Sequence, residues 1–217
     1  GEVLGKLAGA AAGLAGVSGI VDSIFEALDR GKIAATIGAQ LDLTKEEAAQ
    51  AGQIAGNLYA QNYGESFDQI SEAGAAVLST LGNIPDDGVD VIQDLTARAL
   101  TLSDVMGTDV AESTQSVNTL IRNGLAKDAV EGFDLLAAAA QRTPLAMREE
   151  LIPLIDEYGT FFSSLGFNGQ EAFGILVNAS EQGAIAMDKV GDALKETGIR
   201  ATDIGDTAAQ DALTALG

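Results

Sequence analysis

Paired carboxylates are the side chains of this sequence that could carry out acid–base chemistry. The pairs are Glu46 with Glu47, Asp86 with Asp87, Glu149 with Glu150, and Asp156 with Glu157. A glycosidase needs two carboxylates about 5 to 10 Å apart across a cleft, one of them with a raised pKa. Adjacent residues on a helix point in different directions, so helix caps and solvated helix faces explain these pairs better. We therefore expect no enzymatic activity.

Other common reactive sites are missing from the sequence. The chain has no Cys and no His, which removes thiol nucleophiles, Cys/His zinc sites and a Ser-His-Asp triad. Residues 83–94 place Gly88 at the sixth position of a calcium loop, but Pro85 stands at a ligand position. No glycine-rich phosphate loop ending in GK[ST] occurs. We expect neither a cofactor nor a metal ion.

The charge of the chain is strongly acidic. Twelve Lys and Arg residues stand against 32 Asp and Glu residues, which gives a net charge of -20. The basic residues are scattered, and an acidic surface repels nucleic acid unless a basic patch forms. Direct binding of nucleic acid is therefore not expected, and the acidity favours solubility.

Small residues recur at helical spacing near the beginning of the chain. Residues 3–21 are apolar apart from Lys6 and Ser18. Their length approaches a membrane span, but they are mostly Ala and Gly. Glycines at intervals of four residues lie on one helix face and let another helix approach closely. The predicted helix-packing or oligomer contacts are Gly5, Gly9, Gly13, Gly52 and Gly56. Packing within one chain is the alternative, as is insertion of the apolar segment into a membrane after release.

Helix signals run along most of the sequence. Thr44 and Glu47 form a capping box that starts a helix to about residue 60. Apolar residues at helical spacing predict further helices over about residues 65–81 and 88–106.

Beyond residue 107 the predicted helices are short, and each amphipathic segment ends at a glycine. Asp109 and the pair Asn168 and Glu171 are predicted N-terminal caps. Thr143 followed by Pro144 predicts another helix start, and Pro153 is expected to interrupt that helix. The glycines that end segments are Gly124, Gly166, Gly183 and Gly198.

These patterns predict an all-α fold: a multi-helix array with a compact bundle of short helices in the C-terminal half. Six of the ten aromatic residues fall between Phe133 and Phe173, so the core is expected there. The predicted core residues are Phe133, Leu136, Tyr158, Phe161, Phe173, Leu176, Val190 and Leu194. The expected division is an apolar segment at 1–42, a long-helix region at 43–106, a compact domain at 107–200 and a terminal segment at 201–217.

Several segments, in order, resemble the core region of siphophage tail tape-measure proteins. They are NGLAKDAVEGFDLL, then IDEYGTFFSSLGF, then NASEQGAIAMDKVGDALKETGIRATD. The upstream stretch LDLTKEEAAQAGQIAGNLYAQNYGES is similar to the segment before that core in tape measures of actinobacterial phages. Together the segments cover most of the chain, from about residue 40 to residue 202.

The resemblance implies a structural protein of the virion that lies in the tail tube lumen or at the tail tip. Such proteins set tail length, leave the tail ahead of the DNA and help genome delivery across the host envelope. The implied partners are copies of itself as a trimer or hexamer, the tail tube protein, tail assembly chaperones in the host cytoplasm and tail-tip proteins. The host membrane is a further partner after release. The alternatives are a membrane-active, pore-forming helical protein and a soluble all-α adaptor domain.

Overall fold

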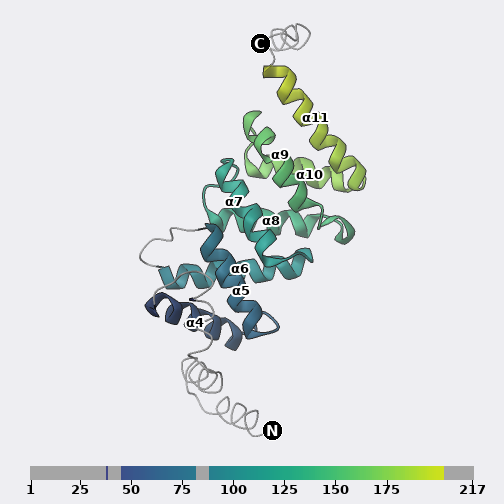
Figure 1. Cartoon of the computed structure of the whole chain (residues 1–217). Helices are drawn as coiled ribbons and strands as arrows, with labels where there is room; N and C mark the ends of the chain where they lie inside the picture. The colour runs from purple at the N-terminus through teal and green to yellow at the C-terminus, as the bar shows by residue number, and fades with distance from the viewer. Residues whose placement is uncertain (1–37, 39–44, 82–87, 203–217) are drawn as a thin grey trace. The chain divides into compact units, whose positions relative to one another are not determined.

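The computed structural model describes residues 38, 45–81 and 88–202, and this part of the chain contains helices and turns but no strands (Figure 1). The all-α prediction is therefore confirmed for the described residues. The chain divides between Thr101 and Leu102 into two compact units. The four-part division made from the sequence stays a prediction.

The first unit contains α4 (Lys45–Ala60), α5 (Phe67–Leu81) and the first part of α6 (Gly88–Met106). α4 packs against α5. The buried residues of α5 recur every three or four positions, which makes one apolar face of the helix. They are Phe67, Ile70, Ala73 and Val77. A hydrogen bond of 2.9 Å from the Asn57 amide to the Gln93 side chain joins α4 to α6.

The second unit is the bundle of short helices. Its elements after α6 are α7 (Val110–Arg122), α8 (Ala129–Arg142), the 3-10 turn η1 (Leu145–Met147), α9 (Leu151–Ser164), α10 (Gly169–Ser180) and α11 (Ala184–Thr202). α9 contacts α7, α10 and α11, and α8 contacts α7 and α10. Figure 1 shows α9, α10 and α11 together in this unit. The fully buried side chains of α9 include Ile155, Tyr158 and Phe162.

Local sequence signals set most helix ends of the second unit. Asp109 accepts a hydrogen bond from the Ala111 amide at the start of α7. Asn168 and Glu171 form the predicted capping box at the start of α10. Three of the four predicted glycine ends have a positive φ, which glycine adopts without steric cost. These are Gly124, Gly166 and Gly183.

The prediction that Gly198 ends a segment is wrong. Gly198 lies inside α11, which continues to Thr202. A Cβ at this position would meet Phe161 at 3.7 Å and the Ser164 hydroxyl at 3.8 Å. The glycine is therefore buried against α9, and the helix continues because one glycine in a helix interior costs only about 1 kcal/mol.

The predicted helix start at Thr143 and Pro144 is also wrong. Thr143 instead ends α8, and its hydroxyl donates to the Ala139 carbonyl at 2.9 Å. Pro144 precedes η1, and the next α-helix begins only at Leu151. Pro153 does not interrupt that helix, because it lies in the first turn, where backbone N–H groups have no partner within the helix.

The predicted core residues differ in their burial. Phe133, Leu136, Tyr158, Phe173 and Leu176 are buried. Phe161, Val190 and Leu194 are half-buried. The three half-buried residues belong to α9 or α11, and the five buried ones all belong to α8, α9 or α10.

Of the glycines predicted to make helix contacts, Gly52 and Gly56 lie in α4 and are buried. A Cβ at Gly52 would meet no atom within 4 Å. Gly5, Gly9 and Gly13 lie outside the described residues, as does Thr44 of the predicted capping box. The role of the glycines in oligomer contacts stays a prediction.

Candidate functional site

A buried tyrosine joins α9 to α11. The Tyr158 side chain is 1% exposed, and its hydroxyl lies 3.0 Å from a carboxylate oxygen of Asp192 and 3.3 Å from one of Asp188. The two aspartates are four residues apart, so they lie on the same face of α11. Gly191 makes this approach possible, because a Cβ there would overlap the Tyr158 ring.

The electrostatics of this cluster keep the tyrosine protonated. Burial is the largest cause that raises the pKa of Tyr158, followed by the hydrogen bond to Asp192 and the charge of Glu157. Lys195 lies 3.5 Å from Glu157 and about 6.0 Å from the centre of the Tyr158 ring. A protonated phenol donates a hydrogen bond but does not act as a base or nucleophile. The cluster is therefore a contact that holds two helices together.

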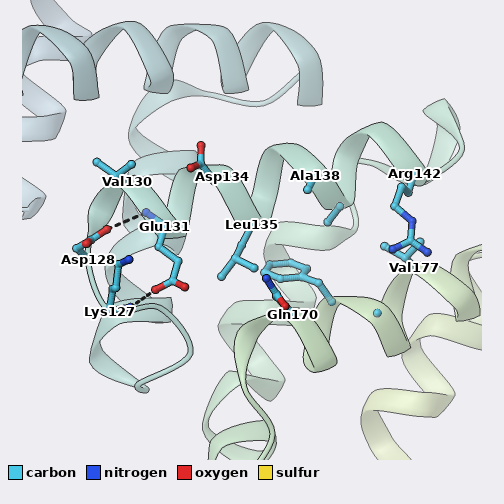
Figure 2. A pocket seen from close by; sticks show the side chains of 13 residues that line it. Lys127, Asp128, Val130, Glu131, Asp134, Leu135, Ala138, Arg142, Gln170 and Val177 are labelled. Atoms are coloured by element: carbon cyan, nitrogen blue, oxygen red, sulfur yellow. Dashed lines mark hydrogen bonds between the residues drawn. The ribbon is translucent and has the colours of Figure 1, made fainter.

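A groove between α8 and α10 is the candidate binding site of the second unit. Its volume is about 620 Å³, and Figure 2 shows it from close by. The apolar side chains that line it are Val130, Leu135, Ala138, Ala139, Phe173 and Val177. Clefts of several hundred Å³ that combine apolar side chains with polar groups are candidates for binding sites.

The charged residues of the groove are distributed unevenly along α8. Asp128 is the N-cap of α8 and follows Lys127, and Glu131 and Asp134 lie in the first two turns of the helix. Arg142 is the last residue of the helix. Figure 2 shows Arg142 near Val177, at the end away from Lys127 and Asp128. The groove thus combines apolar side chains with a mainly acidic end and a basic end.

Helix caps fix the acidic end. The Asp128 carboxylate accepts from the Glu131 amide at 2.8 Å, and the Glu131 carboxylate accepts from the Lys127 amide at 2.8 Å. Both carboxylates satisfy N–H groups that the first turn of a helix leaves without partners. They also interact favourably with the helix dipole. This end of the groove is therefore fixed by local hydrogen bonds.

The start of α10 fixes the opposite wall. The Asn168 and Glu171 capping box begins the helix and places Phe173 one turn later. Gly169 allows α10 to begin against the turn after α7, because a Cβ there would overlap the Leu125 carbonyl.

The carboxylate pairs singled out in the sequence do not meet in this groove. Glu149 and Glu150 are exposed just before α9, and Asp156 and Glu157 are exposed on α9. Although Asp156 reaches solvent, desolvation by the surrounding residues raises the pKa of its carboxyl group. Asp86 and Asp87 lie outside the described residues, and the Glu46 and Glu47 side chains are not described.

The sequence did not reveal the groove. Asp128, Glu131 and Arg142 carry a usable signal, an acidic first turn and a basic last turn, but this signal is typical of any capped helix. Neither does the sequence show that Leu135 of α8 and Phe173 of α10 line a common space. These two residues are 38 positions apart in the sequence.

Within residues 38, 45–81 and 88–202, no cluster of three or more acidic side chains is arranged to hold a metal ion. In the same residues, no helix combines the length and the apolar character that a membrane span requires.

Comparisons with known proteins give one family and one relative. The family described as "Phage-related minor tail protein" matches residues 59–217. The "Probable tape measure protein" of Streptomyces phage phiC31 is 34% identical over 77 residues, which are 36% of this chain and 10% of that protein. The matched part is thus about a tenth of the length of this relative. No solved structure matches the chain.

Proposed function

Because the chain belongs to the phage-related minor tail protein family, we propose that it is a structural domain of a tail tape-measure protein. The observation that carries this proposal is the 34% identity to a protein named as a probable tape measure. The resemblance of several ordered segments to the tape-measure core agrees with it. The proposed location is the virion tail, in the tube lumen or at the tail tip.

The proposed role is steric. Tape measures set tail length, occupy the tube before ejection and leave it ahead of the DNA. A fully helical chain of 217 residues would reach only roughly 325 Å at about 1.5 Å per residue. The second unit folds instead into short packed helices. We propose that this unit is a globular part of the protein and that the measuring rod lies elsewhere in the parent chain.

The proposed partners are copies of this chain, the tail tube protein, tail assembly chaperones and tail-tip proteins. The net charge of -20 supports release, because an acidic surface does not adhere to the DNA that follows it. We propose no enzymatic activity. A band in peptidoglycan zymography that disappears in Glu150→Gln would overturn that part of the proposal.

The proposal is tested on virions of the phage that encodes the chain. Mass spectrometry of purified tails should detect peptides from residues 107–200. After receptor-triggered ejection in vitro, the same peptides should be depleted from the tails and recovered in the medium, while the tube protein stays in place as the internal control. If tails contain no such peptides, the proposed location is wrong. If the peptides stay in emptied tails, the proposed release is wrong.

A further inference from the structure

Two asparagines of the second unit are each followed directly by glycine. They are Asn123, at the end of α7, and Asn168, at the start of α10. The side-chain amide of an asparagine can be attacked by the backbone nitrogen of the next residue. Glycine favours this reaction because it has no side chain that hinders the approach. The two pairs share this local sequence, so their different surroundings in the fold decide how each one reacts.

The fold requires both members of the pair at the start of α10. The Asn168 side chain accepts a hydrogen bond from the Glu171 amide at 3.0 Å, which caps the helix. A Cβ at Gly169 would overlap the Leu125 carbonyl, so glycine is the residue that fits there. Capping and packing together thus place an asparagine directly before a glycine.

The backbone of Asn168 brings the attacking nitrogen to the side of the asparagine side chain. Its ψ of 172° turns the Gly169 nitrogen toward the Asn168 Cβ, and a cyclic imide can close only when these two atoms lie on the same side of the Cα–C bond. Gly169 is the first residue of α10, where an amide has no acceptor within the helix. Asn168 is exposed, so water reaches the group that reacts.

Asn123 has the opposite geometry. Its ψ of -1° turns the Gly124 nitrogen away from the Asn123 Cβ. The Gly124 amide donates to the Ile121 carbonyl at 3.0 Å, and the Asn123 side chain accepts from the Thr160 hydroxyl at 3.3 Å. Ring closure at Asn123 therefore requires the end of α7 to rearrange and its hydrogen bond to Ile121 to break.

We propose that Asn168 is a site of spontaneous deamidation in the folded chain and that the fold protects Asn123. The Gly169 nitrogen loses its proton to a base in the solvent and attacks Cγ of Asn168. The new N–Cγ bond closes a cyclic imide, and the Cγ–Nδ2 bond breaks as Nδ2 takes up a proton and leaves as ammonia. The Glu171 amide stabilises the negative charge that develops on Oδ1 during the attack. Water then opens the imide at either carbonyl and gives aspartate or isoaspartate.

The two products affect α10 differently. Aspartate caps a helix about as well as asparagine, so it preserves the helix start. Isoaspartate continues the chain through its side-chain carbon and inserts one more atom into the backbone, which removes the capping box with Glu171. The start of α10 therefore loosens in molecules that carry isoaspartate. This chemistry is a property of the chain and does not depend on the proposed function.

The experiment follows the full chain during storage at mildly alkaline pH, both folded and unfolded in urea. Glutamyl endopeptidase should release residues 113–131 with Asn123 and residues 158–171 with Asn168, and mass spectrometry of these peptides measures the deamidation of each asparagine. In the folded chain, Asn168 should react roughly tenfold faster than Asn123, because a barrier difference the size of one hydrogen bond changes a rate by about this factor. In urea the two asparagines should react at similar rates. Because Gly169 is buried, Asn168 should react more slowly in the folded chain than in urea.

Asn168→Ser is the matched control, because serine also caps helices but has no amide to lose. This variant should keep the circular dichroism spectrum of wild type, show no deamidation in residues 158–171 and leave the rate at Asn123 unchanged. Two outcomes would overturn the inference: an Asn168 that reacts in urea but stays unmodified in the folded chain, or an Asn123 that reacts at least as fast as Asn168 in the folded chain.

Discussion

Tyr158 holds α11 against α9 through a hydroxyl that must stay protonated. The hydroxyl donates to Asp192 and Asp188, and burial, more than the neighbouring charges, raises its pKa. The unfolded chain has a tyrosine pKa of about 10. The hydroxyl therefore contributes its full stabilisation below about pH 10, where Tyr158 is protonated in both states. This contribution is lost as the pH rises from about 10 through the higher pKa of the folded state, because the unfolded chain releases its proton at a lower pH than the folded chain does.

We predict that Tyr158→Phe lowers the free energy of unfolding by about 1 kcal/mol at pH 8, because the carboxylates lose a donor. The difference from wild type should shrink as the pH rises above about 10. Urea unfolding of both proteins between pH 8 and pH 11 measures it. A difference that stays constant over this range would contradict the assigned role of the hydroxyl.

Gly191 tests the same contact from the opposite helix. A Cβ at this position would overlap the Tyr158 ring, whereas a Cβ at Gly174 in α10 would meet no atom within 4 Å. We predict that Gly191→Ala lowers the free energy of unfolding by about 1 to 3 kcal/mol through overpacking. Gly174→Ala should raise it by about 0.5 to 1 kcal/mol, because alanine favours helix. Equal shifts in urea unfolding would show that the close approach of α9 and α11 does not matter.

At the scale of the element, the proline of α9 shows how position decides the effect of a residue. Pro153 is the third residue of α9, where the helix leaves the backbone N–H without a partner. We predict that Pro153→Ala lowers the free energy of unfolding, by less than about 1 kcal/mol. The variant is slightly less stable because its unfolded chain is more flexible.

The matched control is Thr160→Pro, at an exposed position in the interior of the same helix. It should cost about 3 kcal/mol or more, because it removes a backbone hydrogen bond and clashes with the preceding turn. Thermal unfolding followed by circular dichroism distinguishes the two variants. A Pro153→Ala protein that is clearly more stable than wild type would show that the proline strains α9.

At the scale of the whole molecule, the charge of -20 destabilises the compact state through self-repulsion. We predict that the melting temperature rises by a few °C when NaCl is raised from about 10 to 200 mM, because the screening length falls to less than 10 Å. The rise should level off above that concentration, unlike a general salt effect on hydrophobic burial. A melting temperature that falls with added NaCl would show that favourable ion pairs dominate.

Much of the fold can be predicted from local chemistry. Asp109 and the Asn168–Glu171 pair mark helix starts because their side chains satisfy amides two or three residues away. Gly124, Gly166 and Gly183 mark ends because a positive φ is nearly free for glycine. Gly198 breaks this rule only because its surroundings are non-local, since it faces Phe161 and Ser164.

The sequence by itself determined that the described chain is helical, acidic and similar to tape-measure proteins, because these properties depend on composition, short-range hydrogen bonds and the order of segments. Only the tertiary structure decided that Tyr158 meets Asp192, that Gly191 admits its ring, and that α8 and α10 enclose a groove. Such contacts join residues more than 30 positions apart, and their energy depends on how whole helix faces pack, which no local pattern specifies.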